Sequence, residues 1–392
     1  MNPRKSLIAS RLNKIPPYLF AELDNLKLKY QVQGDIFDFG EGNPTIPPHA
    51  SLINFLKKAL KIKENHRYPS YQGKLVIREA ISDWYKKRFN VIVDPETEVA
   101  ILIGSKEGVA HLFWGLVETG DTVYIPSPCY PVYINQTYLA GGKPKLIPIT
   151  EDNQFLPELG KIKITKNVKL FCLNYPNNPT GAVAPYEFYK EIVNLANKYN
   201  FYCFNDNVYS EIYYTNPPRS ILEVPGAKER CVEFHSLSKT FSICGWRIGF
   251  VVGNSDIIRA LLRVKQNVDS GPFGAIQDTI TYALRNGQKL SDPIRKTYKE
   301  NISYLTNALN KLGWSVRMPE ATFYLWCRIP YKRFAQNSIE FSKYLLEKTR
   351  ILVAPGIGFG KYGEGYIRFA VVLPKIQIKK AITRLQNFQI CD

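Results

Sequence analysis

Side chains able to bind or react with a ligand come directly after short apolar runs at several places in this sequence. They are Gly104-Ser105-Lys106-Glu107-Gly108 after run 99–103, Asn174 to Gly181 after run 168–173, Asp206 and Tyr209 after run 201–204, and Ser236, Ser238 and Lys239 after run 231–235, with Arg247 further on. If the runs are strands of an open α/β sheet, ligands bind outside their carboxyl ends. We therefore expect these groups to converge on one crevice.

The residue types in this set suit one kind of ligand. A helix N-terminus with free N–H groups, together with hydroxyl groups and an arginine, can hold a dianionic phosphate. Lys239 at a strand end is a candidate for a Schiff base, and Asp206 on a neighbouring strand can keep a pyridinium nitrogen protonated. Asn178 and Tyr209 could donate hydrogen bonds to a phenolate oxygen. Together these roles describe bound pyridoxal 5′-phosphate.

Each of these residues has a purely structural interpretation when it is taken alone. Asp206 could cap a turn or a helix, Ser105 could be a helix N-cap, and Arg247 could form a surface salt bridge. The segment 177–181, Asn-Asn-Pro-Thr-Gly, could be a tight turn. Their joint occurrence, each at the end of an apolar run, is what favours a shared ligand site.

The elements that would position these groups are read from the hydrophobic pattern. Apolar runs occur at 99–103, 122–125, 145–149, 168–173, 201–204, 231–235 and 248–252. Short runs that are apolar on both faces are typical of strands covered on both sides. The segment 186–199 between two of them has helical spacing. Alternating strands and helices predict an α/β fold with a mostly parallel, seven-stranded sheet.

We expect three parts along the chain: an N-terminal arm (1–48) that packs with the last part, a large sheet domain (49–286) and a smaller α+β domain (287–392). The last part is predicted to begin with a long amphipathic helix, with Ser291 as N-cap and Pro293 in its first turn. Strands are then expected at 322–327, 351–354 and 366–372, and helices at 339–349 and 376–386.

Composition limits the class of protein. The 392 residues are 45% apolar and 22% charged, as in average globular proteins. The apolar stretches fall short of the roughly 18 residues of a transmembrane helix, and Arg11, Asn13 and Lys14 interrupt any signal-peptide core. Seven cysteines are scattered without a C-x-x-C pair, which favours reduced thiols in the cytoplasm. The four histidines lack ligand spacing, so no metal is expected.

The net charge of +18 invites a nucleic-acid interpretation. However, the lysines are spread along the chain, for example at Lys57, Lys86 and Lys379, and they form no block of about five basic residues. We therefore expect a solvated basic surface, no nucleic-acid partner and no membrane partner. The positive field would favour anionic ligands near a cleft.

Over nearly its whole length, the sequence resembles the class I/II aminotransferases, which are pyridoxal-phosphate enzymes of fold type I. The resemblance rests on four segments: Tyr175-Pro-Asn-Asn-Pro-Thr-Gly-Ala182, Asn205 to Tyr209, Ser236-Leu-Ser-Lys-Thr-Phe241 with Gly245-Trp-Arg-Ile-Gly249, and Gly365-Tyr-Ile-Arg368. It implies Lys239 as the catalytic Schiff-base lysine, which also moves the proton, and Asp206 as the partner of the pyridine nitrogen. It places Asn178 and Tyr209 at the ring oxygen and Tyr130 against the ring.

The same resemblance implies the remaining contacts. Its phosphate cup would consist of Ser105, Lys106, Ser236, Ser238 and Arg247. Arg368 would clamp the substrate α-carboxylate, and Gly42 lies in the matching N-terminal turn. Tyr68 matches a tyrosine that reaches the phosphate of the partner subunit, which implies a homodimer with shared active sites. The substrates would be a small amino acid and a 2-oxo acid.

Finer motifs resemble those of LL-diaminopimelate aminotransferases, which act in lysine biosynthesis. These motifs are Tyr68-Pro-Ser-Tyr-Gln-Gly73, Ile103 to Gly108, Ser127 to Tyr133, Glu233 to Lys239, Asn267-Val-Asp-Ser-Gly271 and Ala321-Thr-Phe-Tyr-Leu-Trp326. Asp269 and Tyr71 could then bind the distal end of the substrate; alternatively, Asp269 caps a turn.

Other functions share parts of this pattern. An alanine or aspartate aminotransferase would share every cofactor residue, and a pyridoxal-phosphate-dependent carbon–sulfur lyase would also keep Lys239 and Arg368. A pyridoxal-sensing transcription regulator would need a fused DNA-binding domain, for which the N-terminal arm is too short. A protein that binds nucleic acid through its charge alone would not depend on Lys239, and its binding would fall steeply with salt.

Overall fold

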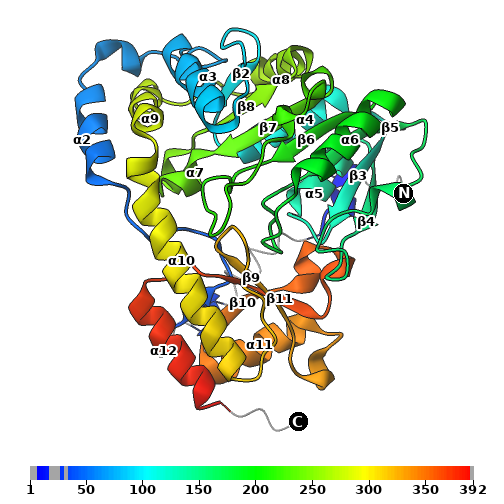
Figure 1. Cartoon of the computed structure of the whole chain (residues 1–392), viewed down its shortest axis with the longest axis vertical. Coiled ribbons are helices and arrows are strands. Elements are labelled where there is room, and N and C mark those ends of the chain that lie inside the picture. Colours follow the sequence, from blue (N-terminus) through cyan, green and yellow to red (C-terminus); the bar gives the residue numbers. More distant parts are fainter. Residues whose placement is uncertain (1–6, 17–26, 31–33, 389–392) are drawn as a thin grey trace, which may run out of the picture.

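The computed structural model describes residues 7–16, 27–30 and 34–388. Part of the expected arm 1–48 therefore lies outside the described residues, and so does Cys391. Figure 1 shows a larger body, in which helices cover both faces of a sheet, above a smaller body with its own sheet. Within the described residues, no helix combines the length and the apolar character that crossing a membrane requires.

The large sheet has seven strands in the order β2-β8-β7-β6-β5-β3-β4. All neighbouring pairs are parallel except those of β8, which runs antiparallel to both β2 and β7. This confirms the predicted mostly parallel α/β sheet, and each of the seven apolar runs supplies one strand. The strands are β2 (Val99–Leu102), β3 (Thr122–Ser127), β4 (Lys143–Pro148), β5 (Val168–Leu173), β6 (Tyr202–Asp206), β7 (Cys231–Ser236) and β8 (Gly249–Gly253).

The continuous apolar character of these strands follows from burial on both faces. In β5, Leu170 and Cys172 belong to one core cluster, whereas Phe171 and Leu173 belong to another on the opposite face. Successive side chains of a strand point to opposite faces, so a sheet between two helical layers needs apolar residues at every position. Polar side chains are therefore concentrated at the strand ends.

Helices connect and cover these strands. The predicted helix 186–199 is present as α6 and ends at Asn200, which has a left-handed backbone conformation. The other helices of this body are α2 (Ala50–Ala59), α3 (Leu75–Phe89), α4 (Ser105–Leu116), α5 (Val132–Leu139), α7 (Leu237–Thr240), α8 (Ser255–Val268) and α9 (Gly274–Asn286). Both α4 and α7 begin directly after a strand, so their first residues lie at the carboxyl edge of the sheet.

The smaller body contains a four-stranded sheet in the order β1-β10-β11-β9. Its edge strand β1 comes from the N-terminal region and pairs in parallel with β10, with Phe37 opposite Ile351. Its elements are β1 (Phe37–Phe39), β9 (Tyr324–Arg328), β10 (Ile351–Pro355), β11 (Tyr366–Ala370), α10 (Gln288–Lys311), α11 (Ser338–Thr349) and α12 (Lys375–Gln386). The expected strands and helices of this region are thus found within a few residues of their predicted bounds.

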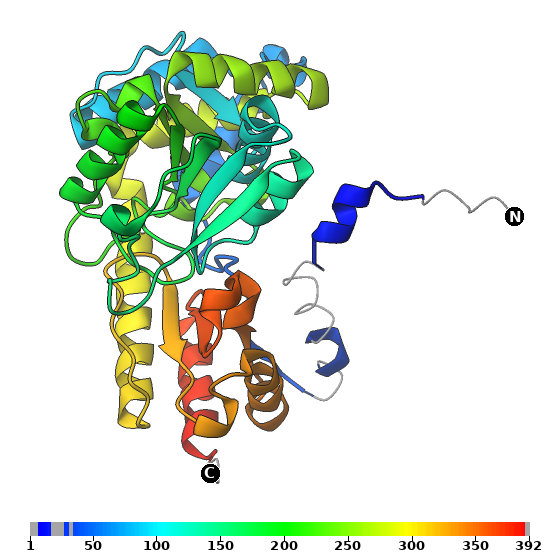
Figure 2. The same ribbon diagram turned by 90° about the vertical axis from the view of Figure 1, so that its right-hand side faces the viewer.

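Helix α10 begins earlier than the pattern predicts. Its first residue is Gln288, so Pro293 lies inside the helix and Ser291 is not its N-cap. The reason is that Leu290 packs into a core cluster of the larger body, so the helix extends back to Gln288 with Gly287 as its N-cap. Both views show α10 running from the larger body along the smaller one (Figures 1 and 2). Farther along, Tyr298 and Leu305 of α10 pack into the core of the smaller body.

Candidate active site

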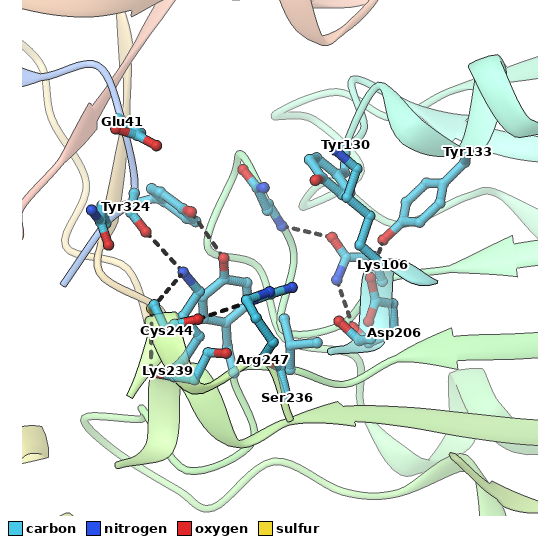
Figure 3. Close-up of a pocket in the computed structure, with 18 of the residues that line it drawn as sticks. Glu41, Lys106, Tyr130, Tyr133, Asp206, Ser236, Lys239, Cys244, Arg247 and Tyr324 are labelled. Carbon is cyan, nitrogen blue, oxygen red and sulfur yellow. Dashed lines mark hydrogen bonds between the residues drawn. The ribbon is translucent and has the colours of Figure 1, made fainter. Parts of the chain in front are cut away.

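A cavity of about 470 Å³ opens at the carboxyl end of the large sheet. In Figure 3, Tyr324 from the smaller body lies on one side of it, and Tyr130, Tyr133 and Asp206 lie on the other. The predicted site residues among its lining are Gly42, Ser105, Lys106, Tyr130, Asn178, Asp206, Tyr209, Ser236, Ser238, Lys239 and Arg247. The folded chain thus brings residues that are far apart in sequence to one crevice, as strand-end placement predicts.

Lys239 lies in the short helix α7, three residues after the end of β7. Its amine Nζ donates a hydrogen bond to the carbonyl of Gly42, at 2.8 Å, and lies 3.7 Å from Sγ of Cys244. The same amine lies 5.6 Å from the ring centre of Phe323. A primary amine held in this way at a cavity wall can react with an aldehyde and can move a proton.

Asp206 is the last residue of β6, and its carboxyl group is buried. Tyr133 donates a hydrogen bond to Oδ2, at 2.7 Å. Among the described residues, Oδ1 has no hydrogen-bond partner. Burial raises the pKa of this carboxyl group to about 7, although the hydrogen bond from Tyr133 acts to lower it. A buried carboxylate with one open oxygen fits a protonated ring nitrogen, because the cation would satisfy that oxygen and restore the charged form.

The amino end of α4 and the side chain of Arg247 lie close together. A Cβ atom on Gly104 would lie only 2.4 Å from Nη2 of Arg247, and one on Gly249 would lie 2.9 Å from the backbone nitrogen of Ser105. Glycine at both positions therefore permits the close approach. The buried hydroxyl of Ser238 has no hydrogen-bond partner among the described residues. A phosphate fits this helix end, guanidinium and hydroxyl.

Arg368 in β11 is fully buried and is not among the residues that line the cavity, but it contacts two that are, Asn178 and Tyr324. Its Nη1 donates to Oδ1 of Asn178, at 2.7 Å, and its Nη2 donates to the carbonyl of Gly40, at 2.8 Å. The guanidinium lies 4.2 Å from the ring centre of Tyr324, whose hydroxyl is 2.9 Å from that of Tyr209. These contacts fix the plane of the guanidinium beside the cavity.

Tyr68 and Tyr71 lie outside the cavity lining. Their exposed fractions are 95% and 42%, respectively. The segment that carries them packs against residues after α8, since a Cβ atom on Gly271 would lie 2.5 Å from the carbonyl oxygen of Ser70. Within one chain, these two tyrosines therefore lie apart from the predicted site residues that line the cavity.

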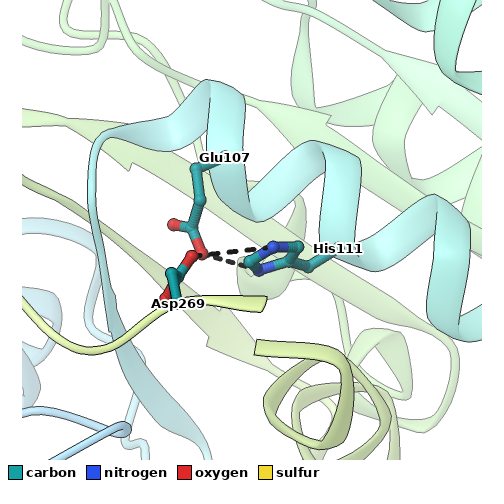
Figure 4. Close-up of side chains that lie close together, drawn as sticks. All are labelled: Glu107, His111 and Asp269. Atoms are coloured by element: carbon teal, nitrogen blue, oxygen red, sulfur yellow. Dashed lines mark ion pairs between the residues drawn. The ribbon is translucent and has the colours of Figure 1, made fainter. Parts of the chain in front are cut away.

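Asp269 also lies apart from the cavity lining, at the C-terminal end of α8. Its carboxylate lies 2.5 Å from Nζ of the buried Lys265 and 3.6 Å from Nε2 of His111. Figure 4 shows Asp269 facing Glu107 and His111 of α4. Glu107 is 3.0 Å from the same Lys265 amine, so an ammonium group already lies between the two carboxylates. Glu107 also accepts a hydrogen bond from the backbone nitrogen of Ile103, which ties this cluster to the start of α4.

Sequence reasoning did not single out several residues of the cavity. Tyr133 and Tyr324 were quoted only within longer motifs, and they contact the predicted site residues Asp206 and Tyr209. Asn174 was named only as the first residue of the segment after run 168–173, and it donates to the backbone carbonyl of Asp206, at 2.6 Å. One signal was available for Tyr133, because it ends the motif Ser127 to Tyr133, which also contains the predicted site residue Tyr130. The two rings are in fact in edge contact, with centres 5.8 Å apart.

Comparison with known proteins gives consistent results. A family model described as aminotransferase class I and II matches residues 34–385. An LL-diaminopimelate aminotransferase of Aquifex aeolicus is 46% identical over 386 residues, covering 97% of this chain and 99% of that protein. The enzyme of the same name from Halothermothrix orenii is 44% identical over 387 residues, covering 97% and 98%. Substrate-bound BacF from Bacillus subtilis superimposes with a TM-score of 0.94 at 34% identity, covering 97% and 98%.

Proposed function

Because the chain belongs to the class I and II aminotransferases, which are pyridoxal-phosphate enzymes, we propose that its amino-acid substrate is LL-diaminopimelate and its oxo-acid partner is 2-oxoglutarate. The main support for this choice of substrate is the sequence identity of 44–46% with LL-diaminopimelate aminotransferases over 97% of the chain. The finer motifs around Tyr68, Tyr71 and Asp269 support the same substrate.

The roles proposed for the cavity residues come from the resemblance to the family, and the gathering of these residues in one cavity supports them. Bound pyridoxal phosphate supplies an electron sink for the charge that develops at the substrate Cα. Asp206, through its open Oδ1, would hold the proton on the ring nitrogen. The start of α4, Ser236, Ser238 and Arg247, which all line the cavity, would hold the phosphate, and Tyr130 would pack against the ring. Asn178 and Tyr209 would donate to the ring oxygen.

Lys239 Nζ takes the proton from the substrate Cα as a general base and returns it as a general acid. Its hydrogen bond to the carbonyl of Gly42 orients the amine at the cavity wall. Arg368 offers two N–H groups in one plane, and this geometry matches a carboxylate. A clamp of this kind orients the substrate, so that the Cα proton faces the lysine amine.

We also propose a homodimer in which Tyr68 completes the partner's phosphate site. The support is an apolar surface: Tyr68, Tyr71, Val268 and Phe273 are all exposed. They lie on adjoining segments, because the ring centre of Phe273 is 5.7 Å from that of His66. Exposed apolar patches of this kind are typical of protein interfaces.

The test of the substrate uses the holoenzyme with 2-oxoglutarate and, in separate assays, LL-diaminopimelate, L-alanine and L-aspartate. Glutamate formation is measured. We expect a kcat/KM for LL-diaminopimelate at least about tenfold above the others. A preference for alanine or aspartate would contradict the proposed substrate. Elimination from a sulfur-containing amino acid, without transamination, would instead identify a carbon–sulfur lyase.

The test of Lys239 is its replacement by alanine. The variant Lys239→Ala should lose transamination and the visible absorbance of the covalently bound cofactor, because it removes the amine that forms the Schiff base. Among the described residues, the cavity lining contains one other lysine, Lys106, which is therefore the alternative to test. Borohydride reduction of the wild-type holoenzyme followed by peptide mapping should label Lys239. Labelling of Lys106 instead would overturn the assignment.

A further inference from the structure

Glu233 is a fully buried carboxylate on β7, directly beside the strand that ends in Asp206. In the pairing of β6 with β7, Asn205 lies opposite Glu233 and Asp206 lies opposite Phe234. Because side chains alternate along a strand, Glu233 and Asp206 point to opposite faces of the sheet. Glu233 therefore lies behind the active site and cannot touch a ligand in the cavity.

Both oxygens of Glu233 have several hydrogen-bond donors. Oε2 accepts from Nδ2 of Asn205, at 3.0 Å, and from the backbone nitrogen of Ile221, at 3.1 Å. Oε1 accepts from the hydroxyl of Tyr85, at 2.9 Å, and from Nδ2 of Asn207, at 3.1 Å. The imidazole Nε2 of His235 lies 3.2 Å from the same oxygen.

This set of donors keeps Glu233 charged. Burial alone would raise the pKa of its carboxyl group, but the contacts with His235, Asn205 and Asn207 outweigh burial and lower the pKa below its ordinary value. A buried charge without such partners would be strongly destabilising. The carboxylate is therefore a strong, fixed acceptor at the centre of the sheet face.

Two of the donors flank Asp206 in the sequence. Asn205 and Asn207 both direct their side-chain amides to Glu233, on the face of the sheet opposite to the side chain of Asp206. The residue between them is thus held from both sides, and its backbone cannot rotate without breaking a bond to Glu233. Asn207 also donates its backbone N–H to the carbonyl of Phe234, at 2.8 Å.

Asn205 extends the same network to the loop that carries Asn178. Its side-chain Oδ1 accepts from the backbone nitrogen of Tyr175, at 3.0 Å, and its Nδ2 donates to the Tyr175 carbonyl, at 3.2 Å. The backbone nitrogen of Asn178 in turn donates to Oδ1 of Asn174, at 2.9 Å. The strand end that carries Asp206 and the backbone of the loop that carries Asn178 are therefore both tied to one buried acceptor, the loop through Tyr175 and its chain neighbour Asn174.

We propose that Glu233 is a positioning residue, which aims Asp206 at the ring nitrogen of the cofactor by holding Asn205 and Asn207 on the far face of the sheet. The inference rests on the role proposed above for Asp206. Its consequence is that Glu233 determines how firmly the ring nitrogen keeps its proton, although no atom of Glu233 reaches the cavity.

The experiment compares the holoenzymes of wild type, Glu233→Gln and Asn207→Ala. Three cofactor properties are measured: the dissociation constant of pyridoxamine phosphate, the pH dependence of the visible cofactor absorbance, and the ¹⁵N chemical shift of labelled cofactor, which reports protonation of its ring nitrogen. The kcat and KM of transamination are measured beside them. Asn207→Ala removes one donor and leaves the carboxylate in place, so it remains informative if Glu233→Gln does not fold.

For both variants we expect a weaker affinity for the cofactor, by about tenfold for Glu233→Gln, which corresponds to the loss of one well-placed interaction. The ¹⁵N signal should shift towards the unprotonated ring, and kcat should fall more than KM rises. A role confined to stability would lower the melting temperature and leave all three cofactor measurements at their wild-type values. That result in a folded variant would overturn the proposal.

A matched control is Glu98→Gln. Glu98 is a largely buried carboxylate that pairs with Lys228, at 2.8 Å, and it precedes β2, at the end of that strand away from the cavity. We expect this variant to lose stability without a change in the ¹⁵N shift. Asp206→Asn separates the two hypotheses: if it too leaves the ¹⁵N shift unchanged, the role of Asp206 itself is wrong.

Discussion

The two faces of the large sheet each hold a buried carboxylate, Asp206 on β6 and Glu233 on β7, and the two groups behave in opposite ways. Within the part of the chain that the structure describes, the carboxylate of Asp206 has one hydrogen-bond donor and one open oxygen, and burial raises the pKa of this group to about 7. Glu233 has donors on both oxygens, and its pKa is lowered despite burial. The described residues thus provide hydrogen-bond donors to both oxygens of Glu233, whereas they leave one oxygen of Asp206 without a donor.

This difference separates a ligand site from its support. A buried polar group that lacks a partner costs free energy in the empty site, and that cost is recovered when a cation or donor binds there. A buried group whose polar atoms all have hydrogen-bond partners gains nothing from a ligand; it holds its partner side chains in fixed positions instead. The same logic applies to Lys265, whose amine is paired with both Glu107 and Asp269 and so requires no ligand.

The largest expected effect is on catalysis, from the incomplete acid. The variant Asp206→Ala should lower kcat/KM for transamination by about 10³-fold. This is the size of effect seen when an active site loses one preorganised electrostatic contact to the reacting groups. The measurement is steady-state glutamate formation by the holoenzyme. Activity within about threefold of wild type would mean that the open oxygen of Asp206 does not serve the cofactor.

The second prediction concerns the stability of the cofactor-free protein. The pKa of Asp206 is about 7 in the folded protein and 3.8 ordinarily, so the unfolded chain loses this proton at lower pH than the folded protein does. As pH rises from 3.8 to 7, ionisation therefore favours the unfolded state more and more, and Asp206 destabilises the wild-type protein. Asp206→Asn should therefore raise the unfolding free energy, by up to about 4 kcal/mol at pH 8 and by little at pH 4. Urea unfolding at both pH values measures the difference. A variant that is less stable at pH 8 would contradict the raised pKa.

The third prediction has the opposite sign. Because the pKa of Glu233 is lowered on folding, its ionised form stabilises the protein above the ordinary value of 4.5, and this contribution is lost as pH falls through the folded pKa. Glu233→Gln should therefore lower the unfolding free energy by about 3 kcal/mol at neutral pH, and the deficit should shrink in acid. An equal deficit at pH 7 and pH 3 would show that the charge is not the stabilising feature.

The smallest effect is expected for Tyr133→Phe, which removes the one donor that the described residues provide to the carboxylate of Asp206. Its hydrogen bond acts to lower the pKa of Asp206, so the variant should raise that pKa further and cost about 1–2 kcal/mol of stability above neutral pH. We expect a kcat several-fold lower, with the acidic limb of its pH profile moved to higher pH. An unchanged profile would mean that Tyr133 only fills space.

Much of this molecule follows from local patterns in its sequence. The apolar runs predict all seven strands of the large sheet, and the spacing of Phe188, Ile192 and Leu195 predicts α6. These predictions succeed because burial on two faces or on one helical stripe leaves a short-range periodicity. Where a distant contact intervenes, as when Leu290 extends α10 before Pro293, the predicted boundary is wrong.

The candidate site shows the same division. Residues at strand ends, such as Lys239 and Asp206, were found from the sequence because parallel strands bring their carboxyl ends to one edge. The contacts of Asp269 with Lys265 and His111 were not, since they depend on how α4 packs on α8. Tyr324 reaches the cavity from the smaller body, and the strand pattern of the larger one contains no information about it.

By itself, then, the sequence determined where along the chain the strands lie and which functional groups follow them, because both depend on residues only a few positions apart. Tertiary structure alone decided that Glu233 has hydrogen-bond donors on both oxygens and that Asp206, among the described residues, has a donor on one. Tyr85 and Glu233 are 148 residues apart, and Tyr133 and Asp206 are 73 apart. A hydrogen bond across such a separation exists only once the helices have packed on the sheet, and no local periodicity encodes it.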